Sequence, residues 1–175
     1  MIKDRGTSFL KGNFCFKRKQ ITRSASAYYL KGKIFIQGYS KTTQGISMLD
    51  GPVFMGENHN LKGLGQAVLN DCKTGIYHPM PHEYTQKYRK DDPILIATGM
   101  KTWNALEKGS KNVDIKAPLE DQITFTPMRF LGTSGDQKGY EWIHEKRIVS
   151  DLDLENLGRA LMEAFSLSEN PYLKE

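Results

Sequence analysis

Two histidines have the spacing of metal ligands on a helix. His78 and His82 are four residues apart, which on an α-helix would place both imidazoles on one face. Pro79 and Pro81 interrupt this segment and oppose a helix, because proline lacks the backbone donor that a helix needs. No Glu follows the first His, as a zinc protease motif requires. We therefore interpret both histidines as solvent-facing loop residues, and a metal-dependent hydrolase that uses them is the weakest of our alternatives.

Other polar groups also lack the arrangement that catalysis needs. Glu57–Asn60 offers a carboxylate, an imidazole and amides, but it precedes an expected helix, so Asn60 reads as its N-cap. His144 and Glu145 are neighbours on an expected strand, where adjacent side chains point to opposite faces. Cys72 has no histidine beside it and reads as a buried core thiol.

Motifs of common enzyme classes are missing from the sequence. It contains no P-loop, dinucleotide-binding fingerprint, nucleophile elbow or CxxC pair. We therefore predict that the protein is not an enzyme and has no catalytic, cofactor-binding or metal-binding residues.

Short strands account for most of the remaining pattern. They are rich in aromatic or branched side chains and are bounded by Gly, Asn or Ser. The expected strands are Phe14–Lys17, Ala27–Leu30, Lys33–Tyr39, Val53–Met55, Val113–Lys116, Gln122–Pro127 and Gly139–His144, the last extending towards Val149.

Three helices are expected between and after these strands. The first follows Asn60 and carries an apolar stripe from Leu61 to Cys72. A shorter helix begins near Thr102 and ends near Gly109, and the segment 75–93 before it reads as a loop. The last helix follows Ser150–Asp153, which resembles a capping box, with Leu154, Leu157, Leu161 and Phe165 along one stripe.

One six-residue pattern occurs in both long helices. Leu64–Leu69 and Leu157–Met162 share the order Leu-Gly-x-Ala followed by two apolar residues. Glycine inside a helix costs about 1 kcal/mol relative to alanine, so its use favours close packing of the helix backbone on a neighbour. We expect both helices to lie against the same sheet, although two short copies do not by themselves establish a repeat fold.

Length and composition indicate a soluble globular protein. The 175 residues fit one domain, and 38% are hydrophobic and 26% charged. No apolar run approaches the roughly 20 residues that cross a bilayer, and the charged N-terminus has no apolar core of a secretion signal. Two cysteines are too few for a disulfide framework. We therefore expect a cytoplasmic protein with no membrane partner.

Positive charge is concentrated in the first part of the chain. Residues 1–49 contain ten Lys or Arg and one acid, whereas residues 50–175 contain 15 bases and 19 acids. Aromatic residues lie among these bases, which is one pattern of nucleic-acid binding. A nucleic-acid-binding domain that uses Lys17, Arg18, Lys19 and Arg23 is therefore the main alternative function. We favour the simpler interpretation, in which the aromatic residues face a core and the basic face selects an acidic protein partner.

Segment 38–52 joins two apolar runs through a polar, glycine-punctuated loop without His, Cys or a catalytic carboxylate pair. The order of this and later motifs resembles the immunity proteins of bacterial contact-dependent growth inhibition. The resemblance covers residues 14 to 167, and segment 75–92 has no counterpart in it. The motifs that carry it are Gly38–Ser47, Gly51–Val53, Leu64–Leu69, Lys101–Leu106 with Lys111–Val113, and Leu157–Leu161.

The resemblance implies a cytoplasmic antitoxin that binds and neutralises the C-terminal toxin domain of a cognate effector, often a nuclease. One binding mode in the family is β-augmentation, in which a toxin hairpin extends the sheet of the immunity protein. We expect a single α/β (α+β) domain over residues 1–175, with an antiparallel or mixed twisted sheet flanked by helices. No small-molecule substrate is expected, and nucleic acid is not the favoured partner.

Toxin contacts are expected near the strands of residues 120–145, where charged and aromatic side chains alternate. The alternative for the two aromatic residues is a place in the core, because they are spaced at strand period. The candidate toxin-binding residues are Arg129, Asp136, Lys138, Tyr140, Glu141 and Trp142.

Overall fold

Four long antiparallel strands form the centre of the sheet, in the spatial order β2-β1-β5-β6. The computed structural model describes residues 23–41, 46–73, 92–118, 121–136 and 138–173. The expected strand Phe14–Lys17 lies outside these residues, as do His78 and His82. The central strands are β1 (Arg23–Leu30), β2 (Lys33–Lys41), β5 (Lys111–Ala117) and β6 (Ile123–Gly132).

Short strands share the two outer edges of this centre. On one side, β4 (Phe54–Glu57) pairs with the first half of β2 and β3 (Ser47–Leu49) with its end. On the other side, β8 (Ile148–Ser150) pairs with the first half of β6 and β7 (Gly139–Trp142) with its second half. All of these pairings are antiparallel. Of the two expected alternatives, an antiparallel or a mixed sheet, the structure therefore has the antiparallel one.

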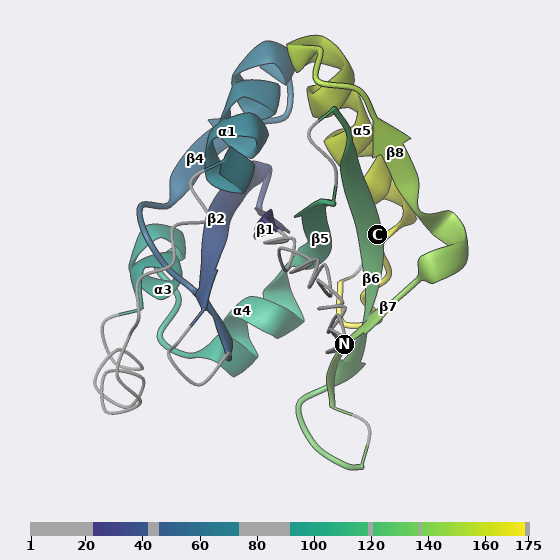
Figure 1. Ribbon diagram of the computed structural model, residues 1–175. Helices are drawn as coiled ribbons and strands as arrows, with labels where there is room; N and C mark the ends of the chain where they lie inside the picture. The colour runs from purple at the N-terminus through teal and green to yellow at the C-terminus, as the bar shows by residue number, and fades with distance from the viewer. Residues whose placement is uncertain (1–22, 42–45, 74–91, 119–120, 137, 174–175) are drawn as a thin grey trace, which may run out of the picture.

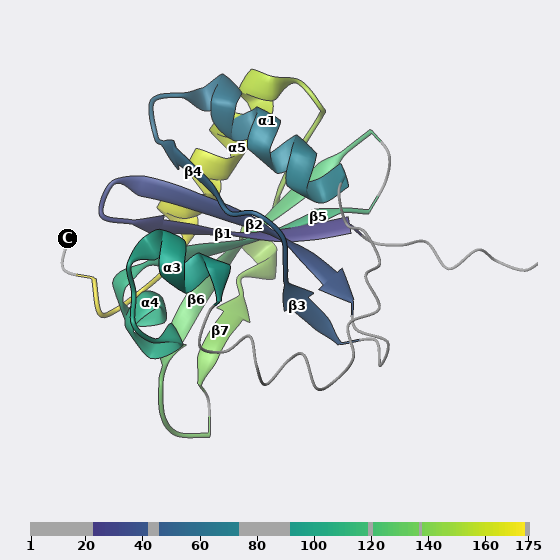
Figure 2. The same cartoon turned by 90° about the vertical axis from the view of Figure 1, so that its left-hand side faces the viewer.

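Two long helices cover one face of the sheet. Helices α1 (Leu61–Lys73) and α5 (Leu154–Leu167) lie side by side over the strands in both views (Figures 1 and 2). Their apolar stripes bury residues such as Leu64, Leu157 and Phe165 against Ile36 and Phe125 of the sheet. This arrangement confirms the expectation that both helices pack on the same sheet.

Two short helices cover part of the opposite face (Figure 2). Helices α3 (Pro93–Thr98) and α4 (Trp103–Gly109) pack on a smaller core that includes Tyr28, Phe35 and Leu106. Figure 2 shows β3 and β7 on this same side of the sheet. The fold is therefore α+β, with helices on both faces of one antiparallel sheet.

The described chain repeats one order of elements. Four strands and a helix, β1 to β4 and α1, are followed after α3 and α4 by β5 to β8 and α5. In the first half, β2 pairs with β1 along one edge and with β4 and β3 along the other. In the second half, β6 pairs in the same way with β5 along one edge and with β8 and β7 along the other. The six-residue pattern of the two helices thus lies at equivalent places in two similar halves.

Local signals predicted the starts of two helices correctly. Asn60 Oδ1 accepts a hydrogen bond from Gly63 N at 3.0 Å, which confirms the expected cap of α1. Thr102 Oγ1 accepts one from Ala105 N at 3.2 Å, so α4 begins at Thr102 as expected. Cys72 is buried in the core as expected.

Four expectations were wrong. The expected loop 38–52 contains the end of β2 and the whole of β3, which pair with each other. Helix α3 replaces the end of the expected loop, because Asp92 caps it and Pro93 occupies its first position. The expected strand from Gly139 towards Val149 is divided, because the 3₁₀ turn η1 (His144–Lys146) separates β7 from β8. The cap of α5 is Asp153, whose Oδ1 accepts from two backbone amides, whereas Ser150 ends β8.

None of the helices that the structure describes combines the length and the apolar composition of a membrane-spanning segment.

Candidate functional site

All six candidate contact residues lie on β6, on β7 or on the loop between them. Arg129 is on β6 and faces Glu141 across the strand pair, while Tyr140 faces Phe130 and Trp142 faces Met128. Asp136 and Lys138 are exposed near the tip of the connecting loop. Gly132, Gly135 and Gly139 have φ values of 122°, 97° and 88°, which side chains disfavour, so glycine is required for this turn. The structure thus gathers the candidates along one edge, here called the β7 surface.

Trp142 is the most prominent apolar side chain of the β7 surface. The residue is 47% exposed, yet the orientation of its indole is restrained because Nε1 donates to Asp114 Oδ2 at 2.9 Å. Lys116 Nζ lies 2.8 Å from the same carboxylate oxygen and 5.3 Å from the centre of the indole ring. The imidazole ring of His144 stacks on the indole, with 6.0 Å between the ring centres. An exposed aromatic residue held in one orientation is a suitable anchor for a protein partner.

Tyr140 is held in the structure more firmly than Trp142. Its ring lies 5.2 Å from that of Phe130, and its hydroxyl donates to Glu107 O at 3.3 Å and lies 3.5 Å from Ser110 Oγ. Burial raises the pKa of Tyr140 well above its usual value, so the hydroxyl stays protonated. This residue therefore links β7 to the end of α4, and its role as a toxin contact stays a prediction.

Arg129 belongs to a network of ion pairs on the opposite face of β7. Its Nε donates to Glu169 Oε2 at 2.6 Å, and its Nη1 lies 3.5 Å from Glu141 Oε2. Lys146 Nζ binds the other oxygen of Glu169 at 2.8 Å. The hydrogen bond from Arg129, and then that from Lys146, lower the pKa of Glu169 to about 2. The guanidinium is thus held in place beside β7 and remains partly exposed.

The C-terminal segment after α5 was not anticipated as part of this region. Glu169 forms a parallel bridge with Arg129, with hydrogen bonds from Phe130 N to Glu169 O and from Glu169 N to Met128 O at 2.9 and 3.0 Å. Asn170 donates through Nδ2 to Ser110 O at 2.6 Å and to Glu107 O at 2.8 Å. The dipeptide Asn170-Pro171, a turn signal, was the one local sign that the chain turns back here.

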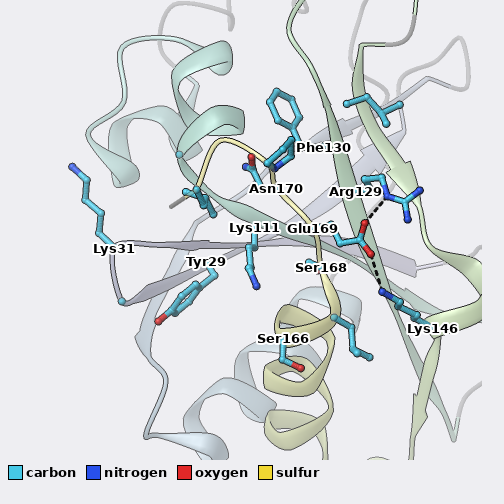
Figure 3. A pocket seen from close by; sticks show the side chains of 16 residues that line it. Tyr29, Lys31, Lys111, Arg129, Phe130, Lys146, Ser166, Ser168, Glu169 and Asn170 are labelled. Atoms are coloured by element: carbon cyan, nitrogen blue, oxygen red, sulfur yellow. Dashed lines mark hydrogen bonds and ion pairs between the residues drawn. The ribbon is translucent and has the colours of Figure 1, made fainter. Parts of the chain in front are cut away.

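A second surface feature, which the sequence reasoning missed, is a groove of about 1020 Å³ at the C-terminal end of α5 (Figure 3). It is bounded by the β1–β2 turn, the start of β5, β6, η1 and the C-terminal segment. Its charged lining residues are four bases and one acid, and we call it the basic groove. These residues are Lys31, Lys111, Arg129, Lys146 and Glu169.

Most of the residues considered for nucleic-acid binding lie outside the part of the chain that the structure describes. Lys17, Arg18 and Lys19 precede residue 23, where the described chain begins, and Arg23 is exposed at the start of β1. Within the described ranges, no group of three or more His, Cys, Asp or Glu side chains is arranged to hold a metal ion. The β7 surface and the basic groove instead offer ion pairs, hydrogen bonds and an oriented aromatic side chain. Such groups can contact a macromolecule.

Solved structures share this fold. A protein of unknown function from Neisseria meningitidis aligns over 86% of this chain and 97% of its own, with a TM-score of 0.65 and 20% identity. A chain of the CdiA-CT/CdiI toxin and immunity complex from Yersinia pseudotuberculosis aligns over 85% of this chain and 98% of its own, with a TM-score of 0.60 and 20% identity. These similarities establish the fold. No protein-family model and no curated protein matches the sequence.

Proposed function

We propose that this protein is a non-enzymatic immunity protein that binds and neutralises the C-terminal toxin domain of a contact-dependent growth inhibition effector. The observation that carries the proposal is the shared fold with a chain of a toxin and immunity complex over 85% of the present sequence. The ordered motifs of the sequence point independently to the same family. A nuclease toxin and a cytoplasmic site of action follow from that resemblance.

The β7 surface is the proposed contact region. Trp142 supplies an exposed, oriented aromatic anchor, and Arg129 and Glu141 supply charges beside it. No strand of the described ranges pairs with the outer edge of β7, so its backbone can accept a strand from the toxin. Main-chain pairing would supply affinity, while the flanking side chains and the loop with Asp136 and Lys138 would supply specificity.

Co-expression with the toxin domain encoded beside this gene tests the proposal. We expect co-purification as a stable complex, and restored growth of cells that produce the toxin. The proposal fails if the two proteins neither associate nor affect one another's activity. A further arm expresses each protein alone. Growth arrest by the present chain alone would identify it as the toxin partner and would also overturn the proposal.

A further inference from the structure

We propose that the basic groove binds an acidic peptide segment of the partner protein, at a site separate from the backbone edge of β7. The identity of the partner rests on the proposed function, whereas the chemistry of the groove does not depend on it. Four basic side chains and a single acidic one line it, so its charged lining carries a net charge of about +3. Segments of opposite charge are therefore attracted to it.

One side of the groove already binds a carboxylate. Arg129 Nε and Lys146 Nζ hold the two oxygens of Glu169 at 2.6 and 2.8 Å, so their charges are partly compensated within the chain. Figure 3 shows Lys31 well apart from this ion-paired trio and Lys111 between Lys31 and the trio. Neither lysine forms an ion pair with any residue in the described ranges. The groove therefore keeps two uncompensated ammonium groups for an external anion.

The backbone at Lys31 gives a second, independent indication. Lys31 and Gly32 form the two-residue turn between β1 and β2, with φ values of 50° and 80°. Such a turn favours Asn, Asp or Gly at both positions, and a long side chain with positive φ is strained. A lysine in the first position costs turn stability, and this lysine is one of the residues that line the groove. Strain retained at a surface turn is expected where the side chain has a binding role.

Aromatic packing favours a peptide over nucleic acid as the occupant. The two aromatic residues that line the groove are Tyr29 and Phe130. The ring of Tyr29 packs at 5.7 Å from Phe165, and that of Phe130 lies between Tyr140 and Tyr172 at 5.2 and 5.5 Å. Phe130 is buried and Tyr29 is only partly exposed, so the groove lining offers no fully exposed ring to stack on bases. Such stacking is the usual source of affinity for single-stranded nucleic acids. Carboxylates of a protein segment need only the two lysine ammonium groups that have no ion pair in the described ranges.

The first experiment measures binding of a fluorescent hexaglutamate peptide by anisotropy at low salt. The groove variant is Lys31→Asn with Lys111→Gln. The matched control is Lys62→Gln with Lys101→Gln, which removes the same charge at exposed positions outside the groove. We expect at least about fivefold weaker binding for the groove variant, the size of two exposed charge pairs, and less than twofold for the control. Equal weakening in both variants, absence of peptide binding, or preferential binding of a hexanucleotide of similar charge would overturn the proposal.

The single variant Lys31→Asn separates binding from folding. Asparagine tolerates positive φ, so the unfolding temperature should rise by about 2 to 4 °C while peptide affinity falls. A variant that keeps the full affinity would show that Lys31 has no role in binding and would contradict the proposal. This combination of a gain and a loss cannot result from misfolding.

A last arm distinguishes failure of the groove from failure of the proposed function. If the toxin domain binds the wild type and the groove variant equally, the groove proposal is wrong and the immunity role stands. If the toxin domain binds neither protein while hexaglutamate still distinguishes them, the immunity role fails and the groove proposal stands.

Discussion

Gly65 of α1 and Gly158 of α5 each lie against the backbone of the other helix. A Cβ atom at Gly65 would be 1.9 Å from Leu154 O, and one at Gly158 would be 2.1 Å from Leu61 O. Leu61 and Leu154 are each four residues before the glycine of their own helix, so the contact is nearly symmetric. Only glycine permits the two backbones to approach this closely.

Replacement of either glycine by alanine should destabilise the protein. Gly65→Ala and Gly158→Ala each force a backbone shift between the two helices, so the free energy of unfolding should fall by about 2 to 4 kcal/mol despite the better helix propensity of alanine. Urea unfolding measures the change. The control is Gly109→Ala in α4, where a Cβ would meet only Leu30 Cδ1 at 3.3 Å. A cost as large at Gly109 would show that the helix contact is not the cause.

Replacement of the Asn170 side-chain amide should destabilise the folded protein. Its Nδ2 satisfies Glu107 O and Ser110 O, two carbonyl groups at the end of α4 and the start of β5. Asn170→Ala leaves them without this donor and should cost about 1 to 3 kcal/mol. Asn170→Asp places a carboxylate against the same carbonyls and should cost more at pH 7 than the alanine variant. Equal stability of the aspartate variant and the wild type in urea would refute this assignment.

Acid should weaken the contact of the C-terminal segment with β6. The pKa of Glu169 in the folded protein is lowered to about 2 from its usual 4.5, so its ion pairs contribute fully above pH 4.5 and are lost as the pH falls towards 2. Glu169→Gln should therefore be less stable than the wild type at pH 6, and the difference should shrink by pH 3. Urea midpoints at both pH values test this. Glu163→Gln, on the exposed side of α5, is the control, and a constant difference for Glu169→Gln would contradict the argument.

Trp142 should contribute more to toxin affinity than to stability. Loss of a well-packed aromatic anchor typically costs about 2 kcal/mol or more, so Trp142→Ala should weaken binding at least about 30-fold. Trp142→Phe keeps an aromatic ring without the hydrogen bond to Asp114 and should have an intermediate effect. Met55→Ala is the control, because Met55 is 56% exposed on β4 at the opposite edge of the sheet. Calorimetric titration would disprove the anchor role if Trp142→Ala bound as the wild type does.

Short-range patterns allowed much of the fold to be predicted. Asn60 caps α1 and α4 begins at Thr102 as expected, strands appear where branched and aromatic residues alternate, and the glycines of α1 and α5 mark a close helix contact. These signals are read within a few residues, because a cap or an apolar stripe depends on near neighbours. The same reasoning expected the six contact candidates near the strands of residues 120–145, but it could not distinguish the anchored Tyr140 from the exposed Trp142.

The sequence by itself determined the two long helices, most of the strands and which of their faces are apolar. Only the tertiary structure decided that Glu169 lies beside Arg129, that Asp114 orients Trp142, and that Lys31 and Lys111 share one groove. These partners are 28 to 80 residues apart along the chain. Their meeting depends on strand order and on how the C-terminal segment returns to the sheet, and no local preference encodes either.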